Sequence, residues 1–302
     1  MKILVTGSSG LIGSGLIRSL STQGDAVLRL GRARRGARQK MPDQAIWNPE
    51  TGFIESDRLK GIDAAVHLAG ESVANRPWIA AKKRRILDSR VQGTRLLADT
   101  LAALDPKPKV LLSASATGFY GHRGEQILDE TSAPGEGFLA EVCTRWEEAT
   151  RPATEAGIRV VHLRIGVVLS RVGGMFPRVL LPFRMGLGGV LGSGAQYLGW
   201  ITLDDVIGAI HHLLAQESIQ GPVNLVAPDP VTNYQFTKTL GRVLRRPTIV
   251  PVPAFALRLL LGEMAEELLL ASTRVEPKAL RASGYAFRHP QLDKALEHLL
   301  GS

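Results

Sequence analysis

Three glycines near the start of the chain have a spacing that is typical of a phosphate-binding turn. Gly7, Gly10 and Gly13 follow the short apolar run 2–6 and precede the helical stretch 16–20. In a strand–turn–helix of this kind the first glycine allows the tight turn, the second lets the backbone approach a pyrophosphate, and the third allows close packing of the helix. The N–H groups at the start of the helix then face the phosphates. The spacing G-x-x-G-x-x-G therefore predicts a dinucleotide site; the alternative is a glycine-rich turn without a ligand.

A basic residue stands where the ribose of such a ligand is recognised. The predicted second strand, 26–30, runs into Gly31 and Arg32. In NAD-binding folds an Asp or Glu at this place accepts a hydrogen bond from the ribose 2′-hydroxyl. No acid is present here, and an arginine pairs with a 2′-phosphate through charge-assisted hydrogen bonds. Arg32 therefore favours NADP over NAD, whereas Arg34 and Arg35 are equally typical of a solvated basic loop.

Hydroxyl side chains gather at the end of a later apolar run. Residues 109–117 contain Ser113, Ser115 and Thr117, and a turn with Tyr120 follows. Hydroxyl groups at the carboxyl end of a strand can orient a carbonyl or an alcohol. Capping of backbone groups is an equally good interpretation of Ser113 and Thr117.

Alternating strands and helices must position these groups. Such alternation implies right-handed crossovers and a parallel sheet that is covered on both faces, with ligands outside the carboxyl ends of the strands. We interpret His67, inside one apolar run, as a core histidine. The predicted strands cover 2–6, 26–30, 61–70, 109–117 and 159–169, and predicted helices cover 78–104 and 138–156.

The chain changes character after Gly173. Residues 173–199 are rich in glycine and contain two prolines and the cations Arg178 and Arg184, a pattern typical of a lid or substrate wall. A helix over 206–214, capped by Asp204–Asp205, follows. Beyond it we expect strands at 223–226 and 248–252, a helix at 233–244 and terminal helices. The fold class is thus α/β, a doubly wound parallel sheet, with a dinucleotide-binding domain at 1–170 that 200–215 rejoins and a smaller C-terminal α/β substrate region at 171–302.

The amino-acid composition is that of a globular protein and argues against a membrane protein. The 302 residues are 44% hydrophobic and 22% charged, as in ordinary globular proteins. No apolar run reaches the ~20 residues that span a bilayer, and the chain begins directly with a predicted strand, so we expect no membrane or signal segment. The single cysteine, Cys143, fits a reducing compartment, and we expect a cytoplasmic protein.

The net charge of +9 indicates attraction of anionic ligands or simply a basic surface. The basic clusters at 32–40 and 82–85 contain no aromatic residue, so nucleic acid is not an expected partner; the second cluster resembles a solvated helix face. His211 and His212 are adjacent on a predicted helix and point apart. Because no other Cys, His and carboxylate cluster is visible, we expect no metal site.

Several motifs resemble those of extended short-chain dehydrogenases/reductases. The narrower resemblance is to the atypical "epimerase family" subgroup of sugar-nucleotide-epimerase-like proteins, whose C-terminal domain is one of unknown function. The resemblance covers nearly the whole chain and implies an NADP-binding extended fold. The motifs that carry it are Lys2–Gly13, Trp47-Asn48-Pro49, Val66–Glu71, Ser113–Gly121, Phe138–Cys143 with Trp146-Glu147, Arg164–Gly166, Pro251–Arg258 and Gly262-Glu263-Met264.

This resemblance assigns roles to individual residues. Ser115, which is nearest to the end of its strand, takes the place of the catalytic serine. Arg90 occupies a position where many extended members have an asparagine. The cofactor positions are Gly7, Gly10, Leu11, Ile12 and Gly13 at the pyrophosphate, Arg32 at the 2′-phosphate, Leu68, Ala69 and Gly70 beside the ribose and nicotinamide, and Arg164, Ile165 and Gly166 near the nicotinamide.

The chain departs from the family in its acid–base pair. The family uses Tyr-x-x-x-Lys on the helix after the serine strand, where the lysine and the cofactor lower the tyrosine pKa. Here those positions hold Leu139 and Cys143. Substitutes near the site are Tyr120, Glu141 and Cys143; we favour Tyr120, which follows a strand end, and interpret Cys143 as a small core residue.

We therefore expect an NADP-dependent oxidoreductase or epimerase-like enzyme that acts on a small substrate, sugar-like or anionic. Ser115 would hold a substrate oxygen, and Tyr120 or a water would relay the proton. The absence of the Tyr–Lys pair leaves two alternatives: a non-catalytic NADP(H) sensor or scaffold, and a structural protein with a relic site.

Overall fold

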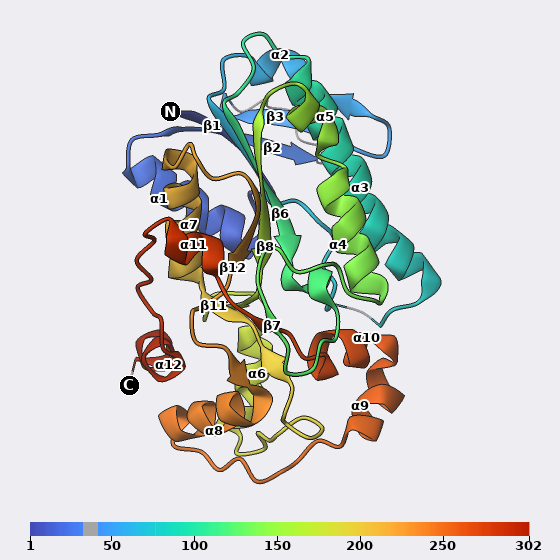
Figure 1. The fold of residues 1–302 in the computed structure, drawn as a ribbon, viewed down its shortest axis with the longest axis vertical. Coiled ribbons are helices and arrows are strands. Elements are labelled where there is room, and N and C mark those ends of the chain that lie inside the picture. Colours follow the sequence, from blue (N-terminus) through green and yellow to red (C-terminus); the bar gives the residue numbers. More distant parts are fainter. Residues whose placement is uncertain (33–41, 76, 302) are drawn as a thin grey trace.

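A computed structural model of the protein describes residues 1–32, 42–75 and 77–301; Arg34, Arg35 and most of the first basic cluster lie outside them. Its centre is an eight-stranded sheet (Figure 1). The strands are β1 (Lys2–Thr6), β2 (Ala26–Arg32), β3 (Gln44–Asn48), β4 (Phe53–Ile54), β5 (Ala64–His67), β6 (Val110–Ala116), β8 (Arg159–Ile165) and β12 (Gly221–Leu225). Their order is β12-β8-β6-β5-β1-β2-β3-β4, and every neighbouring pair is parallel except β3 and β4. The predicted α/β doubly wound sheet is confirmed.

Helices cover both faces of this sheet, as Figure 1 shows. Because side chains alternate along a strand, Ile3 and Val5 pack with helices α1 and α7 on one face, and Leu4 packs with α3 and α5 on the other. The predicted helix 138–156 is two helices, because the chain turns at Thr150 and Pro152 opens the second. The helices of this part are α1 (Leu11–Thr22), α2 (Ser56–Leu59), α3 (Ala80–Ala102), the 3₁₀ turn η1 (Thr117–Tyr120), α4 (Phe138–Glu148), α5 (Arg151–Glu155) and α7 (Leu203–Ala215).

The strand order reverses between β1 and β5. After β1 the chain builds β2 and β3 on one side, and it returns to the other side for β5, β6 and β8. Open α/β sheets bind ligands in the crevice at such a switch point, outside the carboxyl ends of the strands. The glycine turn follows β1 directly, so it lies at this crevice.

The second half of the chain adds a region at the lower end of Figure 1 with its own core, in which Phe176, Trp200, Phe236 and Leu296 pack together. Strand β12 lies within the range predicted for this region but joins the central sheet. The remaining elements, of which β7 comes from the first half of the chain, are β7 (Ile127–Leu128), β9 (Val167–Leu169), α6 (Phe176–Arg184), β10 (Tyr197–Leu198), β11 (Trp200–Thr202), β13 (Val231–Thr232), α8 (Asn233–Leu244), α9 (Ala254–Leu261), α10 (Glu263–Ala265), the π-helical turn η2 (Glu266–Leu270), β14 (Arg274–Val275), α11 (Lys278–Ala282) and α12 (Leu292–Leu300).

Two local predictions for this half are wrong. Residues 248–252 form no strand, because Pro251 lacks an N–H donor and only Val252 makes a β-bridge, to Leu191. The cap of α7 is Thr202, whose hydroxyl accepts the N–H of Asp205, so Asp205 lies in the first turn of the helix instead.

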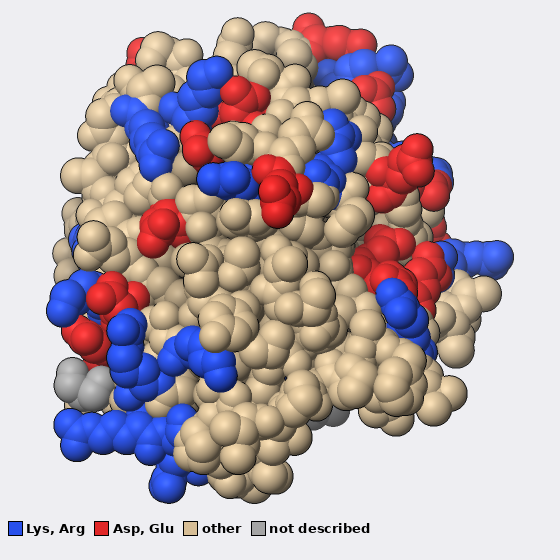
Figure 2. Space-filling model, turned by 60° about the horizontal axis from the view of Figure 1, so that its bottom comes forward, with Lys and Arg blue, Asp and Glu red and all other residues tan. Residues whose placement is uncertain are grey.

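The face in Figure 2 carries a broad area without charged side chains, with cations and anions around its margin. The chain also exposes several large apolar side chains on and around α6 and α9, namely Leu181, Met185, Leu187, Ile249, Val250, Phe255, Leu259 and Leu260. None of the described helices combines the length and the apolar character needed to cross a lipid bilayer.

Candidate cofactor crevice and substrate cavity

The glycine turn tolerates no side chain at two of its three glycines. Gly7 has φ +64°, and a Cβ there would lie 2.6 Å from the carbonyl carbon and oxygen of Leu68. A Cβ on Gly13 would lie 2.3 Å from the carbonyl oxygen of Gly7. The turn is therefore pressed against the end of β5, and α1 begins directly on top of it.

The N-terminus of α1 is open to an anion. Gly10 is the N-cap, no side chain caps the helix, and its first turn contains no acidic residue. The N–H groups of Leu11, Ile12 and Gly13 precede the first intrahelical bond, from Ser14 N–H to the Gly10 carbonyl. Among the described residues none accepts a hydrogen bond from these three N–H groups. Together with the positive end of the helix dipole they suit a pyrophosphate.

A hydrogen-bond chain fixes the neighbouring end of β5. The Thr6 hydroxyl accepts the N–H groups of Leu68 (3.0 Å) and Ala69 (3.1 Å), so its proton points to Nδ1 of His67 (2.8 Å). His67 Nε2 then donates to the Thr94 hydroxyl (2.9 Å). Burial lowers the pKa of His67 to about 4. The interpretation of His67 as a core histidine is confirmed.

Two arginines lie near this crevice in different environments. Arg32 ends β2 with its side chain 62% exposed, and its ion-pair partner, Glu50, is 3.8 Å away. Arg90 packs beneath Gly70, where a Cβ would lie 3.2 Å from its guanidinium carbon, and donates to the carbonyl of Glu71 (2.9 Å). Arg32 is thus a mostly exposed cation at the end of β2, while Arg90 supports the loop after β5.

The second basic cluster is only partly a solvated face. Lys82 is 1% exposed, and its ammonium donates to the carboxylate of Glu71 (2.6 Å) and to the amide oxygen of Asn75 (2.7 Å). The bond from Lys82 lowers the pKa of Glu71. The prediction of a solvated face was wrong for Lys82. Its side chain turns inward because the oxygen atoms of Glu71 and Asn75 accept hydrogen bonds from the ammonium group.

The predicted residues Ser115, Tyr120 and Arg164 belong to one buried network. Ser115 and Arg164 are register partners on β6 and β8, and both bind Glu147 of α4: Ser115 Oγ donates at 2.7 Å, and Arg164 donates twice at 2.9 Å. Arg164 Nη1 also donates to the Tyr120 hydroxyl (3.0 Å), which donates to Asn224 Oδ1 (2.7 Å). Glu147 is the centre that the sequence analysis did not assign.

Two of the three candidate acid–base groups, Tyr120 and Cys143, lie away from open space. Tyr120 is fully buried, and burial raises its pKa. Cys143 is buried, and burial raises the pKa of its thiol to about 11. Glu141 is exposed and pairs with Arg145 on its own helix. Neither Tyr120 nor Cys143 lines the cavity beside the carboxyl end of β6, whereas Leu139 does.

Gly166 is a packing position. A Cβ there would lie 2.5 Å from the carbonyl oxygen of Gly199, and its N–H donates to the carbonyl of Leu225 (3.1 Å). Gly166 separates β8 from β9. The prediction of a single strand over 159–169 was therefore wrong.

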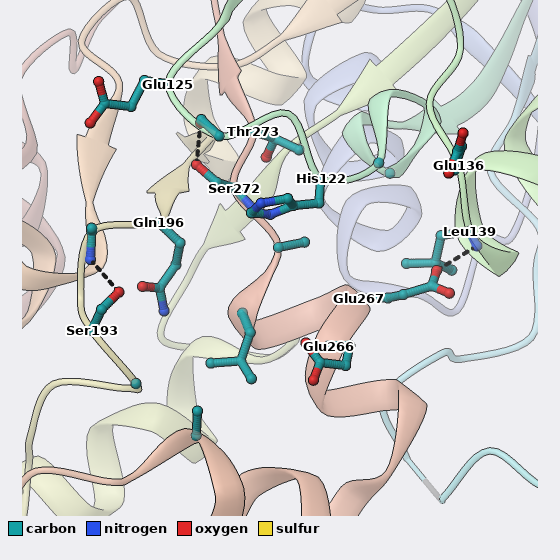
Figure 3. A pocket seen from close by; sticks show the side chains of 18 of the residues that line it. His122, Glu125, Glu136, Leu139, Ser193, Gln196, Glu266, Glu267, Ser272 and Thr273 are labelled. Carbon is teal, nitrogen blue, oxygen red and sulfur yellow. Dashed lines mark hydrogen bonds between the residues drawn. The ribbon is translucent and has the colours of Figure 1, made fainter.

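A cavity of about 700 Å³ opens beside the carboxyl end of β6. Figure 3 shows Leu139 and Glu267 on one side of it, Ser193 and Gln196 on the other, and His122 between them. His122 Nδ1 accepts the N–H of Ser272 (3.0 Å), so the proton of the neutral ring is on Nε2. The lining thus comes from η1, the segment before β10 and the C-terminal turn η2.

The ionisable lining of this cavity is mostly acidic. It comprises Glu125, Glu136, Glu266, Glu267, His122 and Arg258. Arg258 pairs with Glu266, and Glu267 accepts the N–H groups of Phe138 (2.8 Å) and Leu139 (2.7 Å) at the start of α4. Arg178 and Arg184 do not line the cavity. No sequence signal grouped these glutamates, which come from two distant segments.

Comparison with known proteins identifies relatives of the whole chain. Residues 3–226 match the model of the NAD dependent epimerase/dehydratase family, and residues 252–299 match a domain of unknown function, DUF1731. Epimerase family protein Mb2239 of Mycobacterium bovis is 42% identical over 97% of this chain and 96% of its own, and YfhF of Bacillus subtilis is 37% identical over 99% and 98%. The crystal structure of human epimerase family protein SDR39U1 with NADPH is 33% identical, covers 100% of both chains and has a TM-score of 0.90.

Proposed function

Because the chain belongs to the NAD-dependent epimerase/dehydratase family, we propose that it binds NADP(H) and acts as an oxidoreductase or epimerase-like enzyme on a small polar substrate. The open N-terminus of α1 behind the glycine turn carries this proposal. The NADPH in the crystal structure of the human relative supports it.

Each part of the crevice has a proposed role toward the cofactor. The N–H groups of Leu11, Ile12 and Gly13 bind the pyrophosphate beside Gly7 and Gly10, and Arg32 binds the 2′-phosphate. The backbone of Leu68, Ala69 and Gly70 forms the wall beside the ribose, with Arg90 supporting it from below. Arg164 and Gly166 act at the nicotinamide end by positioning β6, β8 and β9. The nicotinamide, when bound, exchanges a hydride with a carbonyl or carbinol carbon.

The cavity is the proposed substrate site, between a cofactor domain (1–170, rejoined by 200–215) and the C-terminal region. Its glutamates disfavour an anionic substrate and favour a neutral, sugar-like one whose hydroxyls donate to carboxylates. Ser115 is 3% exposed, does not line the cavity and donates to Glu147, so its proposed role is to hold the end of β6 in place beside the cavity. Water supplies the proton that Tyr120, held in the buried network, is not placed to supply, and His122 Nε2–H donates a hydrogen bond to a substrate oxygen.

A second candidate is a non-catalytic NADP(H) sensor. Leu139 and Cys143 stand in place of the tyrosine and lysine, and neither exchanges protons near neutral pH. A sensor binds the cofactor as an enzyme does, but it oxidises no NADPH with any carbonyl compound and changes its affinity for a partner with the cofactor's redox state.

Calorimetric titration with NADPH, NADP, NADH and NAD tests the cofactor site. We expect NADP(H) to bind, and Arg32→Ala to weaken NADPH binding at least tenfold, or about 1.4 kcal/mol, without changing NADH binding. Arg29→Ala is the matched control, because Arg29 lies on the same strand but pairs with Asp43. No binding of any dinucleotide overturns the proposal, and NADPH-dependent turnover of neutral polyhydroxy carbonyl compounds separates the enzyme from the sensor.

A further inference from the structure

Two histidines and a carboxylate meet at the N-terminal end of α7. Asp204 lies in the first turn of α7, His289 precedes α12, and His298 lies within α12. Asp204 Oδ2 is 3.2 Å from Nε2 of His298 and 3.9 Å from Nε2 of His289. The expectation that no His and carboxylate cluster exists is wrong. Asp204 and His298 are 94 positions apart, so sequence spacing could not show the contact.

The three donor atoms have the separation that a metal ion requires. All lie within 4.8 Å of one another. A tetrahedral cation with bonds of about 2.1 Å places its ligand atoms roughly 3.4 Å apart, and 3.2 and 3.9 Å bracket that value. The carboxylate and both imidazoles are thus close enough together to share one ion.

The two imidazole rings stack on each other. Their centroids are 4.3 Å apart, and their planes meet at 24°. A metal ion lies in the plane of each imidazole that binds it, so the half-exposed His298 side chain has to turn out of the stack for both rings to bind one ion.

The neighbouring Asp205 fixes the geometry of this cluster. Its carboxylate is 1% exposed and accepts the N–H groups of Arg288 (2.7 Å) and His289 (3.0 Å), together with the hydroxyl of Thr202 (2.9 Å). The backbone that carries His289 is therefore tied to α7. The helix that carries His298 is anchored through its buried residues Leu292, Ala295 and Leu296.

We propose that Asp204, His289 and His298 bind a divalent transition-metal ion of the zinc class. Two imidazoles and one carboxylate suit Zn²⁺, Co²⁺ or Ni²⁺, whereas Mg²⁺ and Ca²⁺ prefer oxygen ligands. Asp204 and His298 are 43% and 52% exposed, which leaves room for water at the remaining coordination position. None of the three residues belongs to the glycine turn or lines the cavity. The bound ion joins the C-terminal helix α12 to α7 and stabilises that contact.

Titration of the tag-free, chelator-treated full chain with ZnCl₂ and MgCl₂ tests this site. We expect one Zn²⁺ per chain with micromolar or tighter affinity, no saturable Mg²⁺ binding, and a higher melting temperature in Zn²⁺. His298→Ala and Asp204→Asn should each weaken Zn²⁺ binding at least tenfold and remove the thermal shift. His211→Ala is the matched control, since His211 lies on α7 but binds Ser19.

If Zn²⁺ shows no saturable binding below 100 µM, which is about 5.5 kcal/mol of binding free energy, the cluster is only an ion pair. Equal loss in His211→Ala and His298→Ala would indicate adventitious histidine binding. Because Asp204→Asn keeps the size of the side chain, it decides the question even if an alanine variant folds poorly.

Discussion

Ser115 and Glu147 lie 32 positions apart, yet the serine hydroxyl donates to the glutamate carboxylate at 2.7 Å. The same carboxylate receives two bonds from Arg164, so one glutamate on α4 holds the ends of β6 and β8 together. The carboxylate of Glu147 on α4 therefore positions the strand ends beside the proposed reaction site. The positions of Ser115 and Arg164 at the ends of β6 and β8 therefore depend on Glu147.

Replacing Glu147 by glutamine should destabilise the fold by about 3–5 kcal/mol, because it leaves the buried Arg164 guanidinium without its counter-charge. Urea denaturation measures the loss. Glu148→Gln is the control: Glu148 is exposed, its ion pair with Arg151 lies at the surface, and we expect a change of about 0–1 kcal/mol. Equal effects of the two substitutions would contradict the central role of Glu147.

Replacing Tyr120 by phenylalanine should affect stability more than chemistry. The change leaves Arg164 Nη1 and Asn224 Oδ1 each without one buried partner, at a cost of about 1–3 kcal/mol. Loss of a general acid costs roughly 10²–10⁴ in rate, whereas we expect less than a tenfold loss of NADPH-dependent turnover. Measuring the free energy of unfolding of Tyr120→Phe checks the effect on stability, and measuring its kcat checks the effect on chemistry. A thousandfold loss of kcat in a stable variant would restore Tyr120 as the proton donor.

His67 should make stability depend on pH between about 6.5 and 4. Its pKa is lowered to about 4 in the folded chain, so in this window the unfolded chain binds the extra proton. The stabilisation is complete above pH 6.5 and is lost as the pH falls, to a limit of about 3 kcal/mol. Urea denaturation at pH 7, 6 and 5 should give a steeper decline for the native chain than for His67→Gln. Parallel curves would show that His67 binds its proton equally well in the folded and the unfolded chain.

Sequence reasoning succeeded where the backbone itself sets the constraint. The spacing of Gly7, Gly10 and Gly13 predicts the turn, because only glycine fits a positive φ or an approach of 2.3–2.6 Å. It failed where the decisive contact is tertiary. The bond from Ser115 to Glu147 requires the register of β6 and β8 against α4, and nothing local announces it.

Buried charge was the other source of error. The run 82–85 has the composition of a solvated helix face, but Lys82 turns inward to Glu71. Likewise, Asp204 and the two histidines near the C-terminus meet only because α12 folds back to α7. Hydropathy patterns describe which side chains prefer water, and a paired charge overrides that preference.

The glycine turn provides the sharpest test, because the chain offers an internal control. Gly7 and Gly24 both have positive φ, +64° and +83°, so alanine at either position pays a similar conformational cost of about 1–2 kcal/mol. Only at Gly7 would the new Cβ collide, 2.6 Å from the Leu68 carbonyl; at Gly24 nothing lies within 4 Å. Gly7→Ala should therefore be the less stable variant and should lose NADPH binding in calorimetry, while Gly24→Ala keeps native affinity. Native NADPH affinity in Gly7→Ala would mean that the cofactor does not depend on this turn.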